Sequence, residues 1–211
     1  MRISDSLIHP QAVSPRRSLW IYTTFLLTAV ALTLGACGKS GEGGGAGGGI
    51  HVKAPGMDER DIPAKSGATY AVTKSFTDKE NKITTATSYR VYVASYDLDA
   101  SQFSMSMDKP LTADDQARVT FSLIGEEGTK DPSPLKPGTY SAKADKFMKV
   151  EDVSIVSRKG GQDNKIIVDR SGLTGEVKIA SVSGDTVSGE LNLTSGDTSI
   201  KGPFTAKVLK R

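Results

Sequence analysis

The chain has 211 residues, a formal net charge of +3 and a single cysteine, Cys37. This length suits one folded domain with additional segments rather than two full domains. One cysteine excludes an intrachain disulfide framework and a zinc site built from several cysteines. The near-neutral charge gives no reason to expect the strongly basic face of a typical nucleic-acid binder, so we expect no nucleic-acid partner.

Residues 1–36 have the order of a secretory leader. Arg16 and Arg17 precede an apolar run at residues 19–34, and the small residues Gly35 and Ala36 follow it. The run of sixteen residues is shorter than the roughly 20 residues that span a bilayer comfortably. This order predicts a signal peptide that is removed. The alternative is an uncleaved membrane helix.

The end of this leader carries a specific motif. Leu34, Gly35, Ala36 and Cys37 resemble the lipobox of bacterial lipoproteins, in which a leucine and two small residues precede an invariant cysteine. The resemblance implies that Cys37 receives a diacylglycerol thioether, that the leader is cut before it, and that the new amino terminus is acylated. A thiolate is a strong nucleophile, which suits it to lipid attachment.

The resemblance also implies where the protein lies. Two or more acyl chains hold a protein firmly to a membrane, so we expect a lipid-anchored protein that does not span the bilayer. Residue 38 is glycine, whereas enteric lipoproteins kept at the inner membrane carry aspartate at that place. We therefore expect an outer-membrane protein on the periplasmic face.

Residues 37–66 read as the acylated cysteine and a tether. Eight of the thirteen residues 38–50 are glycine, which leaves too few side chains to offset the entropy of ordering. A flexible coil of this length spans roughly 20 Å. The irregular segment that follows, with Pro55 and Pro63, reads as more linker, so we expect the folded domain at residues 67–211.

From residue 67 the chain alternates apolar and polar residues in short runs separated by Gly, Pro, Asp and Asn. The alternation is clearest at residues 83–96, 103–107 and 119–123, and this period of two predicts strands with one face on a core. About eight to ten strands predict an all-β fold, an antiparallel β-sandwich or barrel.

The last forty residues predict a three-stranded antiparallel meander. The tetrapeptide Ser-Gly-Asp-Thr occurs twice, at residues 183–186 and 195–198, between alternating apolar runs. Glycine supplies the positive φ of a tight hairpin turn, and aspartate suits the same turn. Residues 187–191 and 202–204 also resemble the C-terminal stretches of envelope lipoproteins from Gram-negative bacteria, a resemblance that implies no particular activity.

The domain offers little for catalysis. Without the leader, His51 is the only histidine, and it lies in the expected linker, which excludes Ser-His-Asp and Cys-His arrangements and histidine-ligated metals from the domain. We therefore expect no enzyme. A histidine-free hydrolase, which needs two facing carboxylates, is the less favoured alternative. Its candidates are Asp97, Asp99, Asp114, Asp115, Glu126, Glu127, Glu151 and Asp152.

Two weaker site hypotheses remain. Asp97 and Asp99 alternate in a polar segment and are the best candidates for Ca²⁺, although a turn in which they bond their own backbone is favoured. Tyr92 and Tyr96 fall on one face of a predicted strand, and an exposed pair of this kind contacts a partner protein or glycan. Core or cross-strand packing of the tyrosines is the favoured interpretation.

The sequence therefore predicts a lipid-anchored envelope lipoprotein whose β domain is a non-catalytic binding or structural module that needs no cofactor. Its expected partner is an envelope protein or glycan. The first alternative is a β-barrel that holds a small apolar molecule, which requires a cavity large enough for that ligand.

Overall fold

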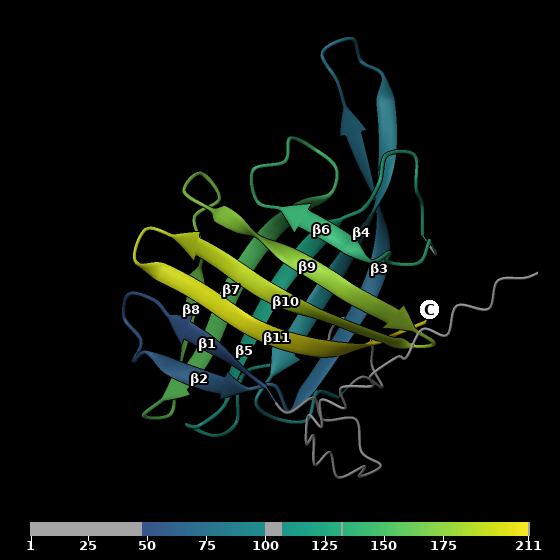
Figure 1. Cartoon of the computed structure of the whole chain (residues 1–211). Helices are drawn as coiled ribbons and strands as arrows, with labels where there is room; N and C mark the ends of the chain where they lie inside the picture. The colour runs from purple at the N-terminus through teal and green to yellow at the C-terminus, as the bar shows by residue number, and fades with distance from the viewer. Residues whose placement is uncertain (1–47, 100–106, 132, 211) are drawn as a thin grey trace, which may run out of the picture. The chain divides into compact units, whose positions relative to one another are not determined.

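The computed structural model describes residues 48–99, 107–131 and 133–210 (Figure 1). In this part of the chain the fold is all β, which confirms the predicted class, and no helix is present that could cross a membrane. The strands are β1 (Gly49–Lys53), β2 (Arg60–Pro63), β3 (Ser66–Thr77), β4 (Ile83–Ala94), β5 (Ala117–Ile124), β6 (Gly138–Ser141), β7 (Lys149–Lys159), β8 (Gln162–Ile167), β9 (Thr174–Ser183), β10 (Thr186–Ser195) and β11 (Thr198–Val208). The strand expected at residues 103–107 falls almost entirely outside the described residues.

Eight of these strands close into a barrel in the order β10-β9-β6-β7-β5-β4-β3-β11, and β11 pairs back to β10. Six of the eight neighbouring pairs are antiparallel, as predicted. The two parallel pairs, β6 with β7 and β11 with β3, are also the shortest, with one and two paired positions. A barrel of this kind leaves few free strand edges. Its two short parallel pairs contribute the fewest backbone hydrogen bonds between neighbouring strands.

The predicted meander is present as β9, β10 and β11. Ser183 pairs with Thr186 and Ser195 with Thr198, so each hairpin turns through a Gly-Asp pair. The φ values of the two turn glycines, Gly184 and Gly196, are 59° and 54°, as such tight turns require.

The folded domain begins earlier than predicted, because β1 and β2 lie inside the expected tether. Ile50 and Val52 of β1 are fully buried, and Ile62 of β2 is 1% exposed. β1 pairs with the start of β11, and β2 pairs with β1. The alternation in β1 is only five residues long and follows a glycine run, which hides its period. The boundary therefore moves from residue 67 to the start of β1.

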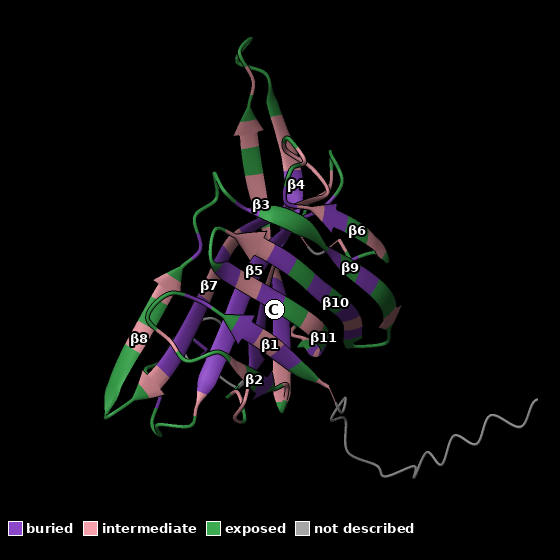
Figure 2. Ribbon diagram, turned by 60° about the vertical axis from the view of Figure 1, so that its left-hand side comes forward, coloured by how far each residue is buried: buried purple, intermediate pink, exposed green. Residues whose placement is uncertain are grey.

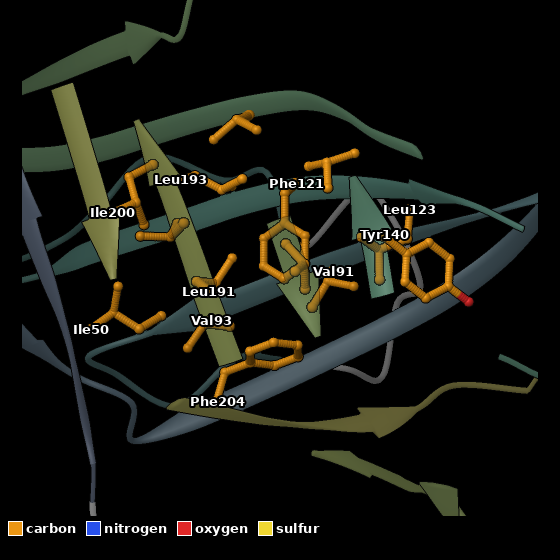
Figure 3. Close-up of a cluster of buried hydrophobic side chains, with 14 of the residues drawn as sticks. Ile50, Val91, Val93, Phe121, Leu123, Tyr140, Leu191, Leu193, Ile200 and Phe204 are labelled. Atoms are coloured by element: carbon orange, nitrogen blue, oxygen red, sulfur yellow. The ribbon is translucent and has the colours of Figure 1, made fainter. Parts of the chain in front are cut away.

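Side chains fill the interior of the barrel (Figure 3). Phe121 of β5 and Phe204 of β11 meet edge to face with ring centroids 5.3 Å apart, and both are at most 1% exposed. In Figure 2 buried residues alternate with exposed ones along β9, β10 and β11, so one face of each strand lies on this core.

A second, smaller cluster packs Ala68, Tyr70, Tyr92 and Met107 against one another. These residues come from β3, β4 and the segment after β4, and they are separate from the barrel core. All eleven strands and both clusters lie within residues 48–211, so this domain contains its own hydrophobic core.

Candidate functional site

The contact between β3 and β11 closes the barrel over a very short length. Lys207 pairs with Ala68 and Val208 with Thr69, and the Leu209 N–H adds a hydrogen bond to the Thr69 carbonyl oxygen at 2.8 Å. Beyond this point β3 runs on to Thr77, and no described strand pairs with it on that side. We call this β3–β11 contact the seam.

A cavity of about 610 Å³ opens beside the seam. We call it the seam pocket. It is formed by β3, β4, the loop between β5 and β6, the end of β9 with the β9–β10 turn, and the end of β11 with the residues after it. Its apolar lining consists of Tyr70, Ala71, Tyr89, Pro134, Leu135, Val182, Val208 and Leu209. Its size is within the range of about 300–1,000 Å³ that is usual for small-molecule sites.

Few polar groups lie in this lining. The Tyr89 hydroxyl donates to the Ser133 carbonyl oxygen at 2.9 Å, and burial raises the pKa of Tyr89, which keeps this hydroxyl neutral. Thr69 is 1% exposed, and its Oγ1 has no hydrogen-bond partner within the described residues. An unpaired buried hydroxyl is unfavourable, so it favours a ligand atom that bonds to it.

Two charged side chains complete the lining. Lys210 follows the seam directly, is exposed, and forms no ion pair with any described residue. Asp131 already takes part in another interaction. The lining therefore combines an apolar wall with one cation that forms no ion pair with the described residues.

A second cavity, of about 500 Å³, lies between the β1–β2 turn and the β7–β8 hairpin and is polar. Most of its charged side chains pair with one another. Arg158 donates to Asp163 at 2.7 Å and Lys159 to Asp58 at 2.7 Å, while Asp114 accepts the N–H groups of residues 160 and 161. We interpret this network as a structural one that holds the two hairpins together.

The weaker hypothesis of an exposed tyrosine pair is wrong for Tyr92, whereas the favoured core packing is confirmed for this residue. Tyr92 is fully buried in the second cluster. It lies against Tyr70 with ring centroids 6.1 Å apart, and its hydroxyl donates to Asp108 and accepts from Arg90. The hypothesis requires that the outward face of β4 meets water, but Met107 packs against Tyr92 on that face.

Tyr96 lies beyond β4, which ends at Ala94, and not on the same strand as expected. It is partly buried, and its hydroxyl accepts a hydrogen bond from Arg118 Nη1 at 2.8 Å. The two tyrosines therefore form no common exposed face.

The structure gives no support to the calcium hypothesis. Asp97 lies 3.0 Å from the Lys65 ammonium, and Asp99 lies 3.9 Å from that of Lys109. No group of three or more potential metal ligands occurs among the residues the structure describes. Each carboxylate thus faces a cation of the protein itself.

Glu151 and Asp152, two of the eight candidate carboxylates of the hydrolase alternative, form ion pairs with cations of the protein. Glu151 is buried and makes an ion pair with Lys74, and Asp152 pairs with Arg170. The other six are exposed.

The lipobox residues Leu34, Gly35, Ala36 and Cys37 lie outside the described residues, so the lipid anchor stays a prediction. Comparison of the chain with protein-family models, curated proteins and solved structures found no significant match. The seam pocket was not anticipated from the sequence, because its lining comes from five separate segments without a common motif.

Proposed function

We propose that this chain is a lipid-anchored protein of the bacterial envelope whose β-barrel is a non-catalytic binding module, with the seam pocket as its binding site. The observation that carries this proposal is the contrast between the filled barrel interior and the apolar cavity of about 610 Å³ at the seam. Ligand sites are typically concave and apolar with a few polar groups, and the seam pocket has this composition.

The anchor part of the proposal rests on the lipobox-like sequence that ends in Cys37. In this proposal, Cys37 carries the acyl chains, which anchor the protein to the periplasmic face of the outer membrane. The tether shortens to the residues between Cys37 and β1, since β1 pairs with β11 and belongs to the folded domain. An envelope protein or glycan remains an additional expected partner.

Binding of a neutral apolar dye tests the pocket. The soluble form, residues 38–211, is titrated with N-phenylnaphthylamine, whose fluorescence rises in apolar surroundings. Ala71 lines the pocket, so Ala71→Trp fills it, whereas Ala180→Trp adds the same side chain at an exposed position of β9. Circular dichroism confirms that both variants fold.

We expect the wild-type domain and Ala180→Trp to bind the dye with similar affinity, and Ala71→Trp to bind about tenfold more weakly, equivalent to about 1.4 kcal/mol. Absence of dye binding by the wild-type domain, or equal binding by all three proteins, contradicts the proposal.

A further inference from the structure

We propose that the seam pocket takes an amphiphile with one acyl chain and an anionic head group, and that Lys210 and Thr69 bind the head while the chain lies along the apolar wall. This inference rests on the proposed function and names the chemical class of its ligand. It follows from the positions of three features of the pocket.

The first feature is the free cation. Lys210 has no ion-pair partner among the described residues, although twelve ion pairs occur elsewhere in them. The carboxylate of Asp131, the other charge in the lining, is not available in the same way, because Asp131 is already engaged. The unused charge of the pocket is therefore positive, which favours an anion over a cation.

The second feature is the buried hydroxyl of Thr69. Thr69 and Lys210 belong to the same end of the pocket, since the Leu209 N–H bonds to the Thr69 carbonyl oxygen and Lys210 is the next residue. An anionic oxygen at this end accepts a hydrogen bond from the Thr69 Oγ1, which otherwise has no partner. Such hydrogen bonds to a charged acceptor are stronger than those between neutral groups.

The third feature is the apolar wall. Ala71, Leu135 and Val182 line the pocket and pack against the barrel core, and they present aliphatic carbon without further unpaired polar atoms. Burial of a flexible hydrocarbon chain against such a surface is favourable in proportion to the apolar area covered. An acyl chain meets this requirement, whereas a sugar or a nucleotide leaves its own polar groups unpaired.

Competition with bound dye tests the head group. The wild-type domain, residues 38–211, is loaded with N-phenylnaphthylamine and titrated with dodecanoate, dodecanol or dodecyltrimethylammonium, each below its micelle concentration. The three compounds share one chain and differ in head charge. We expect dodecanoate to displace the dye at about a tenfold lower concentration than the other two, and this preference to shrink as salt is raised.

Three variants assign the effect to residues. Lys210→Met removes the charge and keeps a similar apolar stem, so we expect the preference for dodecanoate to disappear. Lys207→Met is the matched control, because Lys207 is an exposed lysine of the adjacent strand whose ammonium faces Asp185 at 3.8 Å. Thr69→Val removes the unpaired hydroxyl at equal size, and we expect it to raise the melting temperature while it weakens dodecanoate binding.

Each other result has a definite meaning. Equal displacement by dodecanoate and dodecanol, or a preference that survives Lys210→Met, overturns the anionic head group while the binding function stands. Dye that binds but is displaced by none of the three compounds overturns the acyl ligand. Dye that fails to bind the wild-type domain overturns the proposed function itself.

Discussion

The backbone N–H of Leu209 donates a hydrogen bond to the carbonyl oxygen of Thr69 at 2.8 Å. Together with two paired positions, this bond makes up the backbone connection between β11 and β3. By contrast, β3 and β4 pair over twelve positions. The barrel is thus closed on this side by a short seam, and its apolar cavity lies beside that seam. A place where two strands pair over few positions is thus also a place where a cavity opens.

The seam depends on a glycine. A Cβ at Gly67 would lie 2.0 Å from the Thr205 carbonyl oxygen, so the two strands approach more closely than any side chain permits. We expect Gly67→Ala to lower the free energy of unfolding by about 1–3 kcal/mol, because the backbone must shift. Urea denaturation measures this change.

Gly196→Asn is the control for that substitution. Gly196 has a φ of 54° in a turn, and a Cβ there meets nothing within 4 Å. Asparagine tolerates this conformation, so we expect a small effect. Equal stability of Gly67→Ala and the wild-type domain would show that the seam is not tightly packed.

A substitution at Ile50 tests whether β1 is part of the folded domain. Because Ile50 is fully buried, we expect Ile50→Ala to cost about 2–5 kcal/mol of unfolding free energy. The same substitution at Ile167, which is 74% exposed, should change it by less than about 0.5 kcal/mol. If Ile50→Ala is as mild as Ile167→Ala in urea denaturation, residues 49–63 are linker after all.

His51 predicts a pH dependence of stability. Its Nδ1 lies 2.9 Å from Asp61 and its Nε2 lies 3.0 Å from Glu59, and hydrogen bonds to Asp61 and then Glu59 raise the pKa of His51 above its ordinary value of 6.5. Lys53, 3.8 Å from Glu59, faces the same cluster. The charged imidazolium thus stabilises the fold below the unfolded-state pKa, and this contribution is lost as pH rises through the folded-state pKa.

Urea midpoints measured between about pH 6 and pH 8.5 test this dependence, since the range covers the ordinary pKa and values above it. We expect the wild-type domain to lose more stability over this range than His51→Gln, which cannot titrate. Parallel curves for the two proteins would rule out a contribution from the histidine.

The anchor has its own test in the full chain. We expect mass spectrometry of the membrane-extracted protein to find an acylated N-terminal peptide that begins at Cys37. Cys37→Ser removes the thiol that takes up the lipid, so this variant should keep its leader and lack the lipid. An unmodified wild-type peptide that begins upstream of residue 37 contradicts the anchor.

The sequence predicted the regular parts of this fold well. Alternation and two Gly-Asp turns predicted β9 to β11, and the same period predicted β4 and β5. Such patterns are local, and they are clear wherever one strand face lies on the core and the other in water. β1 was missed because its short alternation follows a glycine run.

The errors at the site have a common physical cause, which is long-range packing. Tyr92 alternates as an outward residue, but Met107 covers it. Thr69 and Val208 meet across the seam although almost the whole domain separates them in sequence. No local pattern records which distant segment covers a strand face or lines a cavity.

Chemical-shift mapping of the methyl groups is the most direct test of the binding site. With dye added to the isotope-labelled domain, we expect the methyl signals of Ala71, Leu135 and Val182 at the seam pocket to shift. The chemical shifts of Ile50 and Ile62, in strands β1 and β2 outside the eight-stranded ring, should not change. Shifts confined to the isoleucines, or no shifts at all at saturating dye, would contradict a binding site at the seam.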